Sequence, residues 1–134
     1  MHEFNVKDLM TTDVLTCSRS TSLRDVVHML HDRRFSCLMI TVDNKPVGII
    51  TERDMVTILA DMLDDVSWDD AAIENFMTSP IITINEDLTL FEAVDMARME
   101  KIRHLPVVND AGELAGILTQ SNIVDGYYQA SVDI

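Results

Sequence analysis

The chain has 134 residues, of which 47% are hydrophobic and 25% charged, and its 23 acidic and 10 basic side chains give a formal net charge of −13. This composition is typical of a soluble globular protein that is long enough to form its own core. The acidic balance argues against DNA, RNA or a membrane surface as partners, because these ligands need basic surface. No apolar run is long enough to cross a bilayer and residues 1–4 do not begin a signal peptide, so we expect a cytoplasmic protein.

The chain contains an internal repeat. The stretch 6–12 returns at 73–79, an offset of 67 positions. After one extra residue the offset becomes 68, at which Gly48-Ile49-Ile50-Thr51 matches Gly116-Ile117-Leu118-Thr119. So many matches in one register predict two similar structural units.

The first repeat begins with a short apolar strand at 14–16. A helix is expected over 23–30, where apolar residues recur at i, i+3, i+4 and i+7. Two strands follow, at 38–42 and 47–50, joined by a turn that contains Asn and Pro. A second helix is expected over 52–63.

The second repeat predicts the same elements in the same order. A strand at 81–84 precedes a helix that begins at a Thr-x-x-Glu capping box at Thr89. Strands are expected at 105–108 and 114–118, and a last helix from Ser121 onward. The order in both copies is therefore β-α-β-β-α.

We expect an α/β fold of two tandem β-α-β-β-α repeats, at residues 1–63 and 73–134, with an acidic connector at 64–72. A unit of about sixty residues is marginal alone, so the copies should pack as one body with a pseudo-twofold axis. Several apolar helix residues suit either a dimer face or the core, and the sequence leaves both readings open. They are Met55, Ile58, Leu59, Met62 and Val124.

Three duplicated or extended features together resemble a known family. They are the Leu-Met-Thr and Phe-Met-Thr segments, the run Arg103-His104-Leu105-Pro106-Val107-Val108, and the paired Gly-h-h-Thr-x-x-Asp/Asn segments, where h is apolar. Over residues 6–128 the chain resembles the cystathionine-β-synthase (CBS) domain pair, also called the Bateman module. The resemblance implies a regulatory module rather than an enzyme. It also implies an adenosine-containing ligand in clefts between the repeats, a homodimer and a regulated protein partner.

The resemblance also implies two sets of ligand-binding residues, each drawn from both repeats. The main cleft would be formed by Thr51, Arg53, Asp54, Thr78, Ile82, Thr83, Ile102, Arg103 and His104. The second cleft would be formed by Thr11, Leu15, Thr16, Phe35, Ser36, Thr119, Ser121 and Asn122.

The residue types in these sets suit a nucleotide. The carboxylate of Asp54 can accept hydrogen bonds from two adjacent ribose hydroxyls. The N-terminus of the helix after Thr51, with Arg53, suits a phosphate. A strand with alternating apolar side chains can form a flat slot for a purine. The expected ligand is AMP, ADP or ATP, with S-adenosylmethionine or a cyclic dinucleotide as alternatives.

The second copy departs from the pattern because Asn122 stands where the first copy has Asp54. A hydrogen bond to a charged group contributes about 1.5–3 kcal/mol, against about 0.5–1.5 kcal/mol for a neutral one. The loss of charge predicts a second cleft that is at least about tenfold weaker, and one competent site per chain.

A purely structural reading stands beside the functional one. Thr51-x-x-Asp54 is also a helix capping box, which needs no ligand. The alternative function is therefore a nucleotide-free structural or dimerisation module whose clefts are vestigial.

Nothing in the sequence indicates catalytic residues, a cofactor or a metal site. His28 and His31 lie three residues apart on a predicted helix, but two ligands are too few for a metal ion. Cys17 and Cys37 lack metal-ligand spacing and are expected to be reduced thiols.

Overall fold

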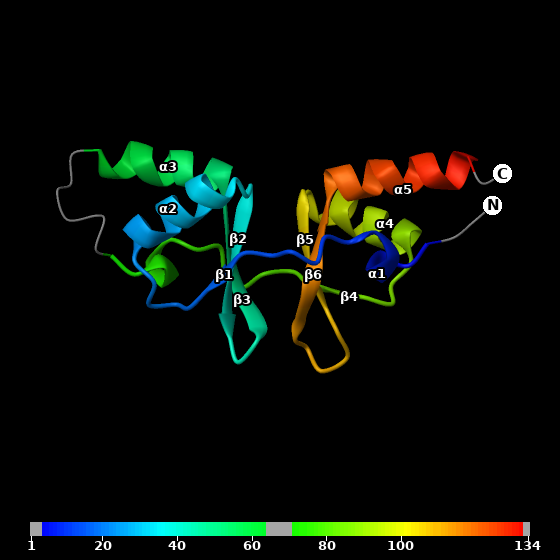
Figure 1. Ribbon diagram of the computed structural model, residues 1–134, viewed down its shortest axis with the longest axis horizontal. Coiled ribbons are helices and arrows are strands. Elements are labelled where there is room, and N and C mark those ends of the chain that lie inside the picture. Colours follow the sequence, from blue (N-terminus) through cyan, green and yellow to red (C-terminus); the bar gives the residue numbers. More distant parts are fainter. Residues whose placement is uncertain (1–3, 64–70, 133–134) are drawn as a thin grey trace. The chain divides into compact units, whose positions relative to one another are not determined.

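The structure is a computed structural model that describes residues 4–63 and 71–132 (Figure 1). It divides into two compact units. The central unit is Leu15–Ile81, and the terminal unit joins Met1–Val14 to Ile82–Ile134. Residues 64–70, most of the predicted connector, lie outside the described residues.

The central unit has the predicted order of elements around a three-stranded sheet. Strand β1 is parallel to β2, and β2 is antiparallel to β3. In Figure 1, α2 and α3 lie on the same side of this sheet. The elements are β1 (Thr16–Cys17), α2 (Leu23–Arg33), β2 (Cys37–Val42), β3 (Lys45–Thr51), α3 (Glu52–Met62) and the short 3-10 helix η2 (Ile73–Asn75).

The terminal unit repeats this topology. Strand β4 is parallel to β5, and β5 is antiparallel to β6. The prediction of an α/β fold built from two β-α-β-β-α repeats is confirmed. The elements are α1 (Val6–Leu9), β4 (Ile84–Asn85), α4 (Leu90–Glu100), β5 (His104–Val108), β6 (Leu114–Thr119) and α5 (Gln120–Val132).

Side-chain caps fix where the helices begin. The Ser22 side chain accepts a hydrogen bond from Asp25 N at the start of α2. The predicted box at Thr89 is present at α4, where the Thr89 side chain accepts from Glu92 N. Both helices end at a residue in the left-handed region, Arg34 after α2 and Lys101 after α4. These local signals explain why both helices lie close to their predicted positions.

The first strand of each repeat lies further along the chain than predicted. The expected strands were 14–16 and 81–84, whereas β1 is Thr16–Cys17 and β4 is Ile84–Asn85. Leu15 is buried in the core and its carbonyl oxygen accepts a hydrogen bond from Met39 N at 2.9 Å, but the paired residues of β1 begin at Thr16. The apolar character of a run therefore does not fix where strand pairing begins.

The compact units do not coincide with the sequence repeats, because the leading segments of the repeats are exchanged. We define the leading segments as residues 4–12 and 73–79. Segment 73–79 lies in the central unit, where Ile73 is fully buried in the core. Segment 4–12 lies in the terminal unit, where Val6 is fully buried.

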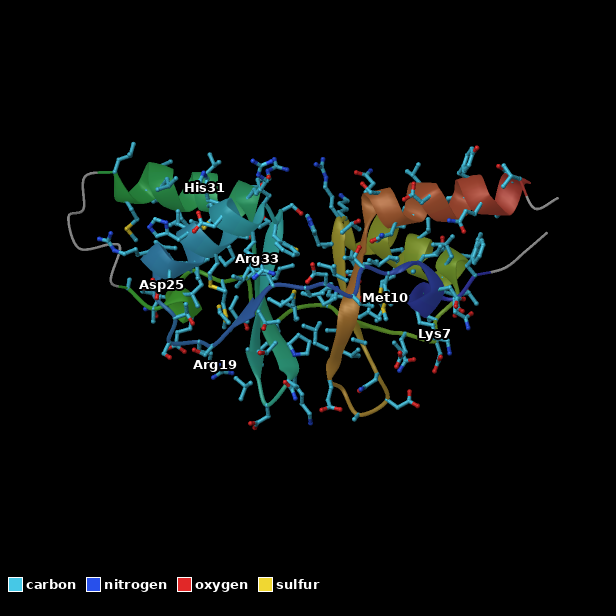
Figure 2. All side chains as sticks on the ribbon, in the orientation of Figure 1. Lys7, Met10, Arg19, Asp25, His31 and Arg33 are labelled. Atoms are coloured by element: carbon cyan, nitrogen blue, oxygen red, sulfur yellow. The ribbon has the colours of Figure 1, made fainter. Side chains whose placement is uncertain are left out.

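Hydrogen bonds fasten each leading segment to its unit. Thr11 N donates to Ile117 O and Ile117 N donates to Thr11 O, both at 2.9 Å. Lys7 Nζ lies 2.9 Å from Asp87 Oδ1, and Figure 2 shows Lys7 on α1. The sequence repeats are at residues 1–63 and 73–134. In the folded chain, each compact unit contains the leading segment of the other repeat.

The structure distinguishes core from surface among the apolar helix residues. Met55 and Ile58 of α3 are buried in the core, and Met62 is half-buried. Leu59 and Val124 are 39% and 61% exposed, so only these two of the predicted set remain available for a dimer face.

Candidate functional site

In the central unit a strand leads directly into a helix at Thr51, and Asp54 lies in the first turn. Thr51 Oγ1 accepts a hydrogen bond from Asp54 N at 3.1 Å, and Asp54 Oδ2 accepts one from Thr51 N at 2.9 Å. The predicted capping box is therefore confirmed. Asp54 is half-buried, and its Oδ1 accepts no hydrogen bond from any described residue. The carboxylate caps the helix with one oxygen and presents the other.

In the terminal unit Asn122 takes the same place after Thr119 but uses all of its side-chain polar atoms. Asn122 Oδ1 accepts from Thr119 N at 2.8 Å and from Thr119 Oγ1 at 2.9 Å. Asn122 Nδ2 donates to Thr11 Oγ1 at 3.3 Å. The amide is thus engaged inside its own unit, in contrast to the Asp54 carboxylate.

Each leading segment packs on the glycine of a Gly-h-h-Thr strand. Gly48 lies against the Met77 side chain, and Gly116 against Met10, which Figure 2 labels beside β6. A Cβ atom at Gly116 would also lie 2.7 Å from Thr11 O. The Met-Thr motif and the Gly-h-h-Thr motif are therefore in contact within each unit. This contact was not predicted from the sequence, although the joint duplication of Met and Gly is a signal for it.

This packing brings Thr78 to the strand that carries the capping box. Thr78 N donates to Ile49 O at 3.0 Å and Ile49 N donates to Thr78 O, two residues before Thr51. Thr78 is exposed. Of the predicted main set, the central unit holds Thr51, Arg53, Asp54 and Thr78.

The other main-set residues lie in the terminal unit. Ile82 is exposed, Thr83 and Ile102 are half-buried, and Arg103 is exposed just before β5. His104 begins β5 and pairs with Thr119.

The second predicted set is also divided between the units. Thr11, Thr119, Ser121 and Asn122 lie in the terminal unit. The central unit holds Leu15, Thr16, Phe35 and Ser36. Leu15 is buried in the core, and Ser36 O accepts a hydrogen bond from Glu52 N at 2.9 Å. Because each set has members in both units, the two clefts themselves stay predictions.

Several cations near the predicted sites are exposed. Arg53 lies in the first turn of α3, and its guanidinium forms no ion pair with any described residue. Arg33 is exposed at the end of α2, where Figure 2 labels it, with its guanidinium carbon 5.8 Å from the centre of the Phe35 ring. Arg53 is thus the cation best placed to meet an anion at the start of α3.

The thiols are held in their neutral form. Burial raises the pKa of the Cys37 thiol to about 11, and burial also raises the pKa of Cys17. Among the described residues, no group of three or more His, Cys, Asp or Glu side chains could hold a metal ion. Within the same residues, no helix has the length and apolar character needed to cross a membrane.

Comparison with known proteins gives the same pattern over almost the whole chain. The sequence model of the CBS domain matches twice, at residues 6–61 and 73–128. An inosine-5′-monophosphate dehydrogenase of Nitrosopumilus maritimus is 29% identical over 128 residues. That match covers 93% of this chain but only 25% of the dehydrogenase.

Solved structures match over both units. The crystal structure of CBSX2 in complex with AMP, a protein of Arabidopsis thaliana, is 26% identical with a TM-score of 0.80. It covers 96% of this chain, which covers 98% of it. The CBS domain pair of protein MJ0100, in complex with 5′-methylthioadenosine and S-adenosyl-L-methionine, is 26% identical with a TM-score of 0.82. That alignment covers 96% of this chain and 99% of the other.

Proposed function

The chain belongs to the CBS domain family, and we propose that it is a regulatory module that binds an adenosine-containing nucleotide at Asp54 and transmits the bound state to a partner protein. The proposal assigns ligand sensing and not catalysis to the chain. The family match and the adenosine ligands bound by CBSX2 and the MJ0100 domain pair support it.

The observation that carries the proposal is the unused oxygen of Asp54. Adjacent ribose hydroxyls are two donors, and one carboxylate oxygen has two lone pairs with which it can accept from both. Asp54 Oδ2 is fixed by Thr51 N, which orients the carboxylate, while Oδ1 has no described donor. A half-buried carboxylate that is already oriented can bind hydroxyls with little loss of side-chain entropy. We therefore place the ribose at Asp54.

The phosphate group fits the start of α3. The first turn of a helix presents free backbone N–H groups and a partial positive charge. Glu52 and Asp54 also lie in this turn, so their negative charges oppose an anion. Arg53 supplies the compensating charge, and it is exposed and without an ion pair among the described residues.

We propose the rest of the main set as the base-binding part of the site. Thr78 and the apolar Ile82 and Ile102 would hold the purine, with Thr83, Arg103 and His104 beside them. AMP is the first ligand to test, since CBSX2 binds it, and ADP, ATP, S-adenosylmethionine and a cyclic dinucleotide follow.

The second set is proposed as a weak or silent site. The amide of Asn122 is committed to Thr119 and Thr11, so a ribose would have to displace existing hydrogen bonds. One nucleotide per chain is the expected stoichiometry.

A thermal-melt panel tests the proposal. A ligand at 100 times its Kd stabilises the folded protein by about 2.7 kcal/mol, which shifts the Tm by several degrees. The shift should disappear in Asp54→Ala and persist in Asp61→Ala, a matched change at an exposed carboxylate later in α3. If no ligand of the panel shifts the Tm, the result would instead favour the nucleotide-free structural or dimerisation module.

A further inference from the structure

The terminal unit contains a pocket that the proposed nucleotide site does not explain. It lies between α4, the start of β5 and the first turns of α5, and its volume is about 220 Å³. Its wall is apolar, with Ala97, Leu105 and Ile123 among its residues. Its polar groups are Arg98, Arg103 and Gln120. The pocket thus combines an apolar lining with two cations and an amide.

The two arginines are exposed and unpaired within the part of the chain that the structure describes. Neither Arg98 nor Arg103 forms an ion pair or hydrogen bond through its guanidinium with a described residue. The chain carries 23 acidic side chains and only 10 basic ones. Two of these few cations therefore lie at one pocket without a described carboxylate to neutralise them.

A structural role explains only part of this arrangement. Arg98 lies in the last turn of α4, where a cation interacts favourably with the helix dipole. That interaction fades within one turn, and Arg103 lies beyond the end of the helix, after the Lys101 cap. The dipole also gives no reason for an open apolar cavity between α4 and α5.

We propose that this pocket binds a small organic anion with a short apolar body. A guanidinium donates two parallel hydrogen bonds to a carboxylate or phosphate, so Arg98 and Arg103, which line the pocket, can bind the anionic group. The apolar wall would cover the carbon chain and exclude water from it. Ligand pockets for drug-sized molecules are about 300–1,000 Å³, so a pocket of about 220 Å³ selects a smaller ligand of a few carbons.

The pocket overlaps the proposed nucleotide site only at Ile102 and Arg103. Arg98 and Ala97 belong to the pocket alone, so substitutions at these positions separate the two proposals. The inference does not depend on nucleotide binding at Asp54.

Hexanoate is the probe, and methyl NMR of the full chain is the measurement. Hexanoate should shift the Ala97 and Ile123 methyl signals, and these shifts should reach a plateau as the hexanoate concentration rises. Hexanol, which has the same carbon body without the charge, should bind at least about tenfold more weakly, as expected for the loss of a hydrogen bond to a charged group. Acetate should shift neither signal. Equal binding of hexanol and hexanoate, or no shift with hexanoate, overturns the proposal.

Two variants and one control locate the binding. Arg98→Gln should weaken hexanoate about tenfold, and Ala97→Leu should fill the pocket and abolish binding. Arg19→Gln, at an exposed arginine of the central unit, should bind like the unmodified protein. Binding that survives Arg98→Gln contradicts the proposal even where Ala97→Leu fails to fold. Displacement of hexanoate by AMP through the same methyl signals also overturns it, because the pocket would then be part of the nucleotide site.

Discussion

Asp54 and Asn122 occupy equivalent places after a strand, yet their side chains are used differently. The Asp54 carboxylate keeps one oxygen without a described donor, whereas the Asn122 amide engages Thr119 and Thr11. Sequence alone predicted the weaker second site from the loss of charge. It did not predict the hydrogen bond to Thr11, because that bond joins residues 111 positions apart.

The substitution Asn122→Asp should therefore create a second nucleotide site. A carboxylate can still accept from Thr119 N. Its second oxygen replaces the Nδ2 group that donates to Thr11 and becomes an acceptor for ribose hydroxyls. The loss of the hydrogen bond to Thr11 should change the stability by about 1 kcal/mol. Calorimetric titration with the ligand identified by the melt panel should show two sites per chain instead of one. Asp54→Asn in the same background should restore one site. A stoichiometry that stays at one in Asn122→Asp contradicts this assignment.

Cys37 should make stability fall at alkaline pH. Its folded pKa is about 11, above the value of about 8.5 for an exposed thiol. Between these values the unfolded chain loses the thiol proton while the folded chain keeps it, so the free energy of unfolding falls as pH rises from about 9 to 11. The buried thiol contributes up to about 3 kcal/mol to this loss. Urea unfolding should show a shallower decline for Cys37→Ala than for the unmodified protein, and parallel pH curves would contradict the prediction.

At the scale of elements, the sequence predicted the local features, such as caps and turns, better than the packing between distant segments. The caps at Thr51 and Thr89 and the turn at Asp43-Asn44, where both residues have positive φ, lie where the sequence indicated. The exchange of the leading segments was not predicted, because periodicity shows that a segment is buried but not which hairpin it covers.

The glycine contacts of the leading segments should differ in their tolerance of a side chain. At Gly116 an added Cβ would meet the backbone oxygen Thr11 O at 2.7 Å, and this backbone is held by two hydrogen bonds to Ile117. At Gly48 the nearest atoms all belong to the flexible Met77 side chain. Gly116→Ala should therefore lower the free energy of unfolding by about 1–3 kcal/mol, and Gly48→Ala by less.

Chemical denaturation of the two variants measures this difference directly. Both substitutions replace a strand glycine with the same residue, so the change in unfolded-chain entropy is matched. An equal loss, or a larger loss for Gly48→Ala, would contradict the prediction.

At the scale of the whole molecule, the net charge of −13 and the apolar surface of α5 act in opposite directions on self-association. Val124, Tyr127, Tyr128 and Val132 are each at least 50% exposed on α5. Exposed apolar residues grouped on one helix indicate a protein interface. The homodimer implied by the family resemblance would bury them, while two chains of −13 repel one another over long range.

This balance predicts a homodimer whose Kd falls as the salt concentration rises. It also predicts that the dimer dissociates when an acidic residue replaces an exposed apolar residue of α5. Salt screens the repulsion beyond about 8 Å at physiological ionic strength but leaves apolar contact intact. Sedimentation equilibrium should show a lower dimer Kd as NaCl is raised. Tyr128→Asp and Val124→Asp should give monomers, whereas Gln129→Asp, an equal charge at an exposed polar position of the same helix, should change the Kd far less. A dimer that survives both apolar substitutions would exclude α5 as the interface, and α3, where Val56 is 68% exposed, would be the next helix to charge.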